Sequence, residues 1–342
     1  MTQHPLQPGW IDRPHQHFEL GDFVLDSGEV LRDAQLCWVL HGELPPQGGE
    51  AVLALSAIGG NHHRLDFLIG PGRALDPARH AVLCIDALGN GLSSSPSNSR
   101  RQPGLAFPRF SIGDMVRAQK QLVDHLGIGR LAAVVGASMG GMQALHWAVA
   151  YPDRMRKLVA MTPMARTSAW AAAVNAAARG ALMADPRWAE PGHASAGMQA
   201  WIAVMQLLSG RTPGSLESEF DGAAAMQHWL DQRLAWQRGQ GTHPIDWVWQ
   251  SHAYDAHDVG RVPGFGGDTA AALASVRADT LVLAPPLDLY NPRACAEWVA
   301  RHVPGARLVQ IDSPRGHQSA GAARAQDAAF LNDVIGEFLR SA

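Results

Sequence analysis

The chain has 342 residues, with 28 Lys and Arg against 31 Asp and Glu and a net charge of −3. This near balance argues against a nucleic-acid binder or a polybasic membrane protein, because both need a positive field. Hydrophobic residues make up 46% and charged residues 17% of the chain, so a large core can form and wholesale disorder is excluded. The length favours one large α/β domain, or a core with an insertion.

The cysteines and the N-terminus point to a reducing compartment. Cys37, Cys84 and Cys295 lie far apart and fit neither a zinc site nor a disulfide framework. Residues 1–20 are polar, lack the apolar run of a signal peptide and are expected to form a loose arm. No stretch approaches the roughly 20 apolar residues of a membrane span. We therefore expect a cytoplasmic protein that binds neither membrane nor nucleic acid.

Short apolar runs bounded by Gly, Pro and Asp predict strands, and amphipathic runs between them predict helices. The run 80–89 is continuously apolar, which favours burial on both faces, as in a parallel sheet. Ser111 is the candidate N-cap of the first helix and Gly127 its stop. The predicted strands are 34–42, 51–60, 80–89, 131–138, 157–163, 279–286 and 306–312, the helices 111–127, 139–152 and 325–339, with a loop at 45–49. This alternation predicts a mostly parallel sheet with helices on both faces.

The composition changes near residue 165. From there to about residue 265 the sequence is Ala-rich, polar and helical in period, without a convincing strand, and it contains seven of the eleven tryptophans. We interpret 166–265 as an inserted helical lid between two parts of one core, 21–165 and 266–342. Any single lid tryptophan is expected in the lid core or a dimer interface rather than in an acyl pocket.

The most specific motif is Gly136-Ala137-Ser138-Met139-Gly140, which matches G-x-S-x-G between a predicted strand and a predicted helix. Such a tight turn needs small residues and presents the serine hydroxyl at the start of a helix. Backbone N–H groups there can bind an oxyanion. The sequence therefore predicts a nucleophilic Ser138, and the alternative is a structural turn with a capping serine.

A nucleophilic serine needs a base, and the base needs an orienting acid. In enzymes with this motif an acid and then a histidine follow later strands. Asp288 and His317 come directly after the last two predicted strands and are our candidates. Asp312 is a rival acid, but it ends the strand that leads to the histidine loop. Asp279 precedes its strand, at the wrong end of a parallel sheet.

The oxyanion hole should use two backbone amides, one of which belongs to Met139, the residue after the nucleophile. The second should come from the loop 56–61 after an early strand, and we choose Ile58. His62 and His63 follow this loop. Adjacent residues rarely face one ion and no third ligand is evident, so we expect a polar loop at the pocket rim rather than a metal site. Nothing else in the sequence indicates a metal or a bound prosthetic group.

The segment 136–159 around the predicted nucleophile resembles that of the homoserine O-acetyltransferase family. The resemblance spans roughly residues 25–340, with further similar segments at 69–84, 107–128, 181–188 and 254–260. It implies an α/β-hydrolase fold with a helical lid, a triad of Ser138, Asp288 and His317, and often a dimer formed through lid helices. The family moves an acetyl or succinyl group from a coenzyme A thioester through an acyl-serine to a substrate hydroxyl. The resemblance thus implies acyl-CoA as a co-substrate and no bound cofactor.

The substrate-binding positions follow the family pattern only in part. Arg179 matches the family's substrate-binding arginine, which implies a contact with a carboxylate or phosphate. Gln318 follows the histidine where the family has an Asp that contacts the substrate amino group. Trp247 aligns with a Tyr that helps hold the substrate carboxylate, and the segment 86–98 also differs. We therefore expect an O-acyltransferase that uses an acceptor other than homoserine.

Two alternatives stay open. A hydrolase of a small ester or thioester needs the same triad, so these residues cannot choose between water and a hydroxyl compound as acceptor. A non-catalytic ligand-binding protein of this fold is the third interpretation. The complete set of Ser, Asp and His argues against it, because a binding protein does not need all three.

Overall fold

The structure is a computed structural model that describes residues 6–44, 51–190, 196–239 and 243–341. Its centre is an eight-stranded sheet in the order β1-β2-β4-β3-β5-β6-β7-β8. The strands are β1 (Gln16–Val24), β2 (Val30–His41), β3 (Ala51–Leu55), β4 (Ala81–Ile85), β5 (Leu131–Ala137), β6 (Met155–Met161), β7 (Asp279–Ala284) and β8 (Arg307–Gln310). The β1–β2 and β2–β4 pairs are antiparallel, and the pairs from β4 through β3, β5, β6 and β7 to β8 are parallel. The predicted mostly parallel sheet is confirmed.

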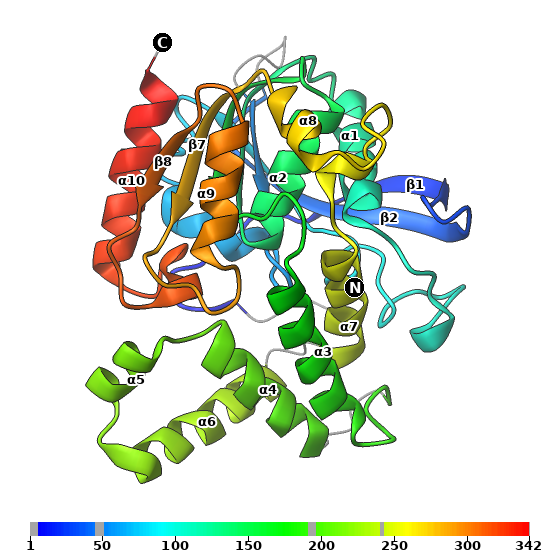
Figure 1. Cartoon of the computed structure of the whole chain (residues 1–342). Coiled ribbons are helices and arrows are strands. Elements are labelled where there is room, and N and C mark those ends of the chain that lie inside the picture. The colour runs from blue at the N-terminus through cyan, green and yellow to red at the C-terminus, as the bar shows by residue number, and fades with distance from the viewer. Residues whose placement is uncertain (1–5, 45–50, 191–195, 240–242, 342) are drawn as a thin grey trace.

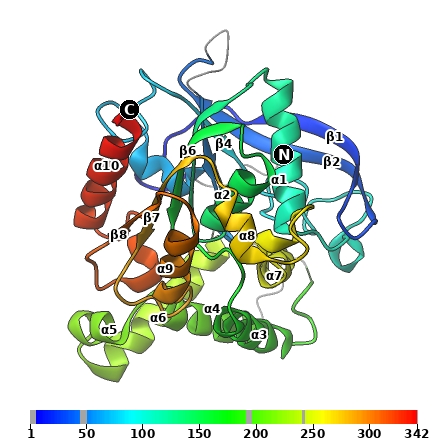
Figure 2. The same cartoon turned by 45° about the horizontal axis from the view of Figure 1, so that its top comes forward.

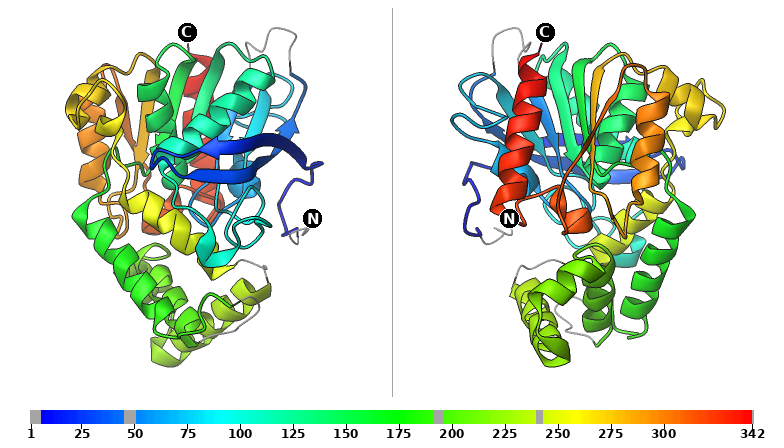
Figure 3. Two further views of the ribbon diagram at one scale, coloured as in Figure 1. Left: turned by 90° about the vertical axis from the view of Figure 1, so that its right-hand side faces the viewer. Right: turned by 60° about the vertical axis from the view of Figure 1, so that its left-hand side comes forward.

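Helices cover both faces of this sheet (Figure 1). The core on one face includes Leu122 of α1, Leu145 of α2 and Val299 of α9. The core on the other face includes Leu68 of η1 and Ile335 of α10, which lies in front of the sheet in the right-hand view of Figure 3. The bounds are η1 (His62–Leu68), α1 (Ile112–His125), α2 (Met139–Ala150), α8 (Thr269–Ala274), α9 (Arg293–His302) and α10 (Ala325–Arg340). Among the described residues, no helix is both long and apolar enough to cross a bilayer.

The chain leaves the sheet after β6 and forms a run of helices before it returns to β7. These are α3 (Ala169–Met183), α4 (Ala196–Leu208), α5 (Pro213–Glu219), α6 (Gly222–Gly239) and α7 (Pro244–Asp255). They gather at one end of the molecule, where α3 and α7 adjoin the core and α4, α5 and α6 lie farther from the sheet (Figures 1 and 2). The described part of the predicted lid, 166–265, contains no strand. The lid faces the carboxyl ends of the parallel strands, which is where ligands bind in such sheets.

Most predicted elements are present, with shifted ends. Ser111 caps α1 through a capping box with Asp114, which confirms that N-cap. The predicted arm 1–20 is too long, because β1 starts at Gln16 and pairs with β2 from there. The predicted strand 51–60 ends at Leu55, and the chain then turns at Gly59, which has a φ of 63°. The predicted loop 45–49 lies outside the described residues.

A buried carboxylate ties the lid to the core. Asp246 of α7 is 4% exposed and accepts hydrogen bonds from the amide of Ser97 at 3.0 Å and from its hydroxyl at 2.5 Å. Burial raises the pKa of Asp246 to about 7, although these hydrogen bonds oppose the rise. The folded protein therefore favours the protonated carboxyl.

We expect Asp246→Asn to gain stability relative to wild type as the pH rises. Below about pH 4, Asp246 is protonated in both the folded and the unfolded protein. Between about pH 4 and 7 it is protonated only in the folded protein, so the free energy of unfolding of wild type falls as the pH rises. The relative gain from about pH 4 to 8 is at most about 4 kcal/mol, from roughly three pKa units. Urea unfolding at both pH values measures it. Asp312→Asn, at an exposed carboxylate, serves as the control and should show no such trend. A pH-independent difference for Asp246→Asn would contradict the prediction.

Candidate active site

Ser138 lies on a tight turn between β5 and α2. Its φ of 58° and ψ of −122° are conformations that non-glycine residues rarely adopt. A Cβ at Gly136 would lie 2.1 Å from the carbonyl oxygen of Gly140, and a Cβ at Gly140 would lie 2.5 Å from that of Leu55. The glycines of the motif are therefore needed because the turn folds back on itself and packs against the end of β3.

The structure brings Ser138, His317 and Asp288 into one hydrogen-bonded line. His317 Nε2 lies 2.7 Å from Ser138 Oγ, and its Nδ1 lies 2.7 Å from Asp288 Oδ2. All three residues are at most 6% exposed. Asp288 Oδ1 accepts the backbone amides of Tyr290 at 2.8 Å and Asn291 at 2.9 Å, which fixes the carboxylate plane. This arrangement directs Nε2 at the serine hydroxyl, as a general base requires.

The rival residues lie away from the serine. Asp312 is exposed after β8, and Asp279 is exposed at the first residue of β7. His302, at the end of α9, pairs its Nδ1 with the carbonyl of Trp298 at 2.8 Å. The order of strands in the sequence was therefore sufficient to separate Asp288 and His317 from their neighbours.

The two predicted oxyanion donors lie on segments that converge at Ser138. Met139 is the first residue of α2, so its amide has no acceptor within the helix. Ile58 lies in the loop after β3, and the amide of the next residue, Gly59, donates to Gln250 Oε1 of α7 at 2.8 Å. Gln143 of α2 donates to the carbonyl of Ser56 at 3.1 Å. The loop is thus held from both sides, and the roles of the two amides stay predictions.

Trp247 of α7 packs on the same loop. It is 4% exposed, and its Cδ1 lies 3.6 Å from where a Cβ of Gly59 would be. Its ring lies 5.2 Å from that of Trp201 in α4. Gln318 follows His317 in the short helix η4 (Gly316–Ser319) and is half-buried. Trp247 therefore adjoins the loop after β3 and Gln318 adjoins His317, and their roles in substrate binding stay predictions.

Arg179 is already engaged by a lid carboxylate. Its Nη2 lies 2.7 Å from Asp255 Oδ2, and its Nη1 donates to Ser251 Oγ at 2.9 Å. Asn175 donates to the other oxygen of Asp255 at 2.7 Å. Burial, followed by the charges of Arg109 and Arg179, lowers the pKa of His252 to about 4. A substrate anion at Arg179 would have to share its guanidinium with Asp255.

The expectation of a polar rim loop at His62 and His63 is wrong, because both side chains are buried. His62 Nδ1 lies 2.8 Å from Asp86 Oδ2, and His63 Nδ1 lies 2.7 Å from Asp66 Oδ2. Burial favours the neutral carboxyl of Asp86, but hydrogen bonds, first that of His62, hold its pKa below the usual value. Within the described residues, no group of three or more His, Cys, Asp or Glu side chains is placed to hold a metal.

The sequence analysis missed three polar residues around the triad. The Tyr254 hydroxyl donates to Asn291 Oδ1, and the Tyr290 hydroxyl donates to Asn175 Oδ1 at 2.7 Å. The Tyr290 ring meets His317 edge-on, with ring centroids 5.1 Å apart. Tyr254 lies in one of the segments that resemble the family and Asn291 lies near Asp288, but no local pattern pairs residues so distant in sequence.

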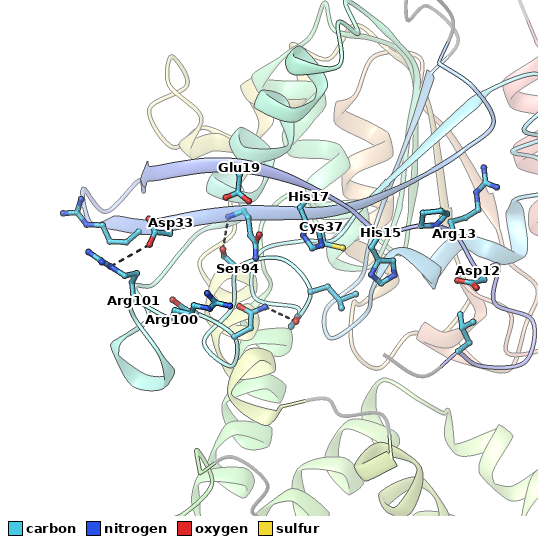
Figure 4. A pocket seen from close by; sticks show the side chains of 18 residues that line it. Asp12, Arg13, His15, His17, Glu19, Asp33, Cys37, Ser94, Arg100 and Arg101 are labelled. Atoms are coloured by element: carbon cyan, nitrogen blue, oxygen red, sulfur yellow. Dashed lines mark hydrogen bonds and ion pairs between the residues drawn. The ribbon is translucent and has the colours of Figure 1, made fainter. Parts of the chain in front are cut away.

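A large groove of about 1520 Å³ lies elsewhere, along the β1–β2 ribbon (Figure 4). Charged and polar side chains line it, among them Arg13, His17, Glu19 and Arg101. None of the described residues that line it belongs to the triad.

Comparison with known proteins agrees with this geometry. A family profile described as alpha/beta hydrolase fold matches residues 50–191. The chain is 32% identical over 338 residues to a homoserine O-acetyltransferase of Nostoc punctiforme, covering 92% of each protein.

Two solved ester hydrolases have a similar structure. The acetyl esterase MekB has a TM-score of 0.89 and 27% identity, covering 96% of this chain and 97% of that one. An acetylester hydrolase from Corynebacterium glutamicum has a TM-score of 0.88 and 25% identity, covering 96% of each chain. The chain is thus an enzyme with acyltransferase or hydrolase activity. It belongs to the homoserine O-acetyltransferase family, within the α/β-hydrolase fold.

Proposed function

We propose that the protein transfers a short acyl group through an acyl-serine on Ser138 to an acceptor other than homoserine. The observation that carries this proposal is the line from Ser138 through His317 to Asp288, with 2.7 Å at each link. The strained turn supports it, because residues held in rare backbone conformations cluster at active sites.

The chemistry follows from this line of residues. His317 Nε2 takes the proton of Ser138 as Oγ attacks the acyl carbon, and Asp288 stabilises the imidazolium. The amides of Met139 and Ile58 stabilise the oxyanion. His317 then returns the proton to the departing alcohol or thiol, which leaves an acyl-serine. An acceptor hydroxyl then gives its proton to His317 and attacks the acyl carbon, and His317 returns that proton to Ser138 Oγ as the acyl–Oγ bond breaks.

The side chains at the site make homoserine a poor acceptor. Gln318 is neutral and cannot form an ion pair with an ammonium group. Arg179 is largely neutralised by Asp255 at 2.7 Å. Trp247 adds apolar surface and one donor beside the oxyanion loop. We therefore propose an acceptor without an α-amino group, with acyl-CoA as one candidate donor.

Hydrolysis of a small ester is the second candidate. It is favoured by the likeness to two ester hydrolases at 27% and 25% identity. In that case water replaces the hydroxyl acceptor, and every residue above keeps its role. A homodimer through the lid helices and a cytoplasmic location stay predictions in either case.

Asp288→Asn is expected to lower kcat for p-nitrophenyl acetate by about 10⁴-fold, because an amide holds His317 in the wrong tautomer. Asp312→Asn is the matched control at the rival carboxylate and should stay within about twofold of wild type. Ser138→Ala gives the background rate. Equal losses in the two Asp variants would contradict this assignment of the acid.

The acceptor can be identified with acetyl-CoA or p-nitrophenyl acetate as the acetyl donor. The rate of leaving-group release would be measured with L-homoserine, with a neutral alcohol, and with neither acceptor present. Intact mass would follow acetylation of Ser138. We expect the neutral alcohol to speed release and to appear as its acetate, and homoserine to have little effect. Release with water alone would favour the hydrolase, and acceleration by homoserine would refute our proposed acceptor.

Gln318→Asp is expected to raise the preference for homoserine over the neutral alcohol about tenfold, because a carboxylate can pair with the substrate ammonium. Gln318→Asn, which has the same shape as Asp but no charge, is the control. The ratio of kcat/KM values for the two acceptors is the measurement. If neither variant gains, Trp247 or the segment 86–98 also blocks homoserine.

A further inference from the structure

A cavity of about 500 Å³ lies between the loop after β3, the helix η1 and the lid. Its walls include Gly59 and Gly60 of that loop and Ala322, which lies beyond η4. Trp236 of lid helix α6 also lines it and is 39% exposed. The cavity therefore adjoins both the loop that carries the predicted oxyanion donor and the segment that follows His317.

The accessible charges that line this cavity are positive. Four titratable side chains line it, and two of them, His63 and Asp66, pair with each other at 2.7 Å. The side chains of this pair are at most 3% exposed, so they offer no charge to a ligand. The other two are Arg64, which is half-buried, and Arg73, which is exposed. A ligand in this cavity would therefore meet two guanidinium groups and no accessible carboxylate from the described residues.

Both guanidinium groups bind backbone carbonyls and have no carboxylate partner among the described residues. Arg64 Nη2 donates to the carbonyl of Ala320 at 3.0 Å. Arg73 Nη1 donates to the carbonyls of Asp66 at 3.0 Å and Ile69 at 3.2 Å. Burial lowers the pKa of Arg64 to about 10, and no carboxylate of the described residues opposes that fall. A charge held partly out of water without a counterion is costly, and an anionic ligand would supply the counterion.

Two small features complete a cradle of donors around Arg64. Asn61 Oδ1 accepts the amide of His63 at 3.1 Å, so its Nδ2 is left to donate, and no described residue accepts from it. A Cβ at Gly321 would overlap Arg64 Nη1, so this glycine leaves the room that the guanidinium occupies. The wall thus combines positive charge with N–H groups that have no protein acceptor, which is the chemistry that binds phosphate oxygens.

We propose that this cavity, the phosphate pocket, binds a phosphate ester through Arg64, Arg73 and Asn61. Two guanidinium groups and an amide match the charge and the several oxygens of a phosphate better than those of one carboxylate. Trp236 offers an aromatic surface to the organic part of the ester. The phosphate belongs either to the leaving group of the acyl donor or to a separate ligand, and the test separates these sources. The inference goes beyond the proposed function and does not depend on it, because binding here needs no attack by Ser138.

The bland alternative is that both arginines only fasten the backbone. Arg64 would then hold the loop after His317 through the carbonyl of Ala320, and Arg73 would hold the end of η1. In that case loss of either side chain would lower stability, while the affinity for phosphate would not depend on them.

The test is isothermal titration calorimetry of the full chain at low ionic strength, with inorganic phosphate, CoA and pantetheine as ligands. We expect inorganic phosphate to bind, and Arg64→Met and Arg73→Met each to raise its Kd about 10-fold, because each removes a charge-assisted contact. Arg301→Met, at an exposed arginine of α9, is the matched control and should stay within about twofold of wild type. Pantetheine keeps the thiol arm of CoA but has no phosphate. Tighter binding of CoA than of pantetheine, lost in the same two variants, would assign the phosphate to the donor. Equal binding of these two, with inorganic phosphate bound, would assign it to a separate ligand.

The inference would be overturned if inorganic phosphate did not bind to wild type, or if it bound equally well to Arg64→Met and Arg73→Met. If Arg64→Met does not fold, Arg73→Met carries the test alone, because Arg73 is exposed and its loss leaves no cavity in the core. None of the three ligands carries an acyl group, so the result does not depend on the serine mechanism. Failure of the proposed function would appear separately, as turnover of p-nitrophenyl acetate by Ser138→Ala at the wild-type rate.

Discussion

The close approach of the nucleophile turn to β3 is the constraint on which the site depends. Gly140 has room for no Cβ because the carbonyl of Leu55 would lie 2.5 Å away. That contact places the start of α2 against the end of β3 and the loop that follows it, the two segments that carry the predicted oxyanion donors Met139 and Ile58. It also forces Ser138 into a strained backbone conformation that only the surrounding sheet can maintain. Fully buried parallel strands on both sides supply that rigidity.

The lid helix α7 completes the site by contacts along its whole length. Asp246 binds Ser97 at the first turn of α7, Gln250 accepts the amide of Gly59 at its middle, and Tyr254 donates to Asn291 at its end. Each contact joins a side chain of the lid to a loop at the carboxyl ends of the strands. The lid is therefore part of the site's geometry as well as its cover. A single helix thus joins the loop that carries Ser97, the loop after β3 and the loop that follows Asp288.

The G-x-S-x-G motif and the order of the strands along the sequence were enough to predict which three residues form the triad. Ser138 has a motif with a steric reason for each glycine, and Asp288 and His317 are fixed by the order of buried strands. Contacts between distant segments could not be predicted from the sequence. Gln250 and Gly59 are 191 positions apart, and Tyr254 and Asn291 are 37 positions apart. His62 was misplaced for the same reason, since its partner Asp86 lies on another loop, whereas His63 pairs with Asp66 only three positions away. The edge strand β1 was missed because it is half-exposed and interrupted at Gly21.

The choice of acceptor is a question of charge and water, which the triad does not decide. An amino-acid acceptor brings an ammonium and a carboxylate, and each needs a partner when water is excluded. Gln318 offers the ammonium no charge, and Asp255 already occupies the guanidinium of Arg179. Transfer of such a zwitterion into a site with Ser138 2% exposed would leave both charges poorly paired. A neutral hydroxyl compound meets no such cost, and water meets even less. Under the proposed function, the fit of the lid, rather than the catalytic residues, therefore decides between transfer and hydrolysis.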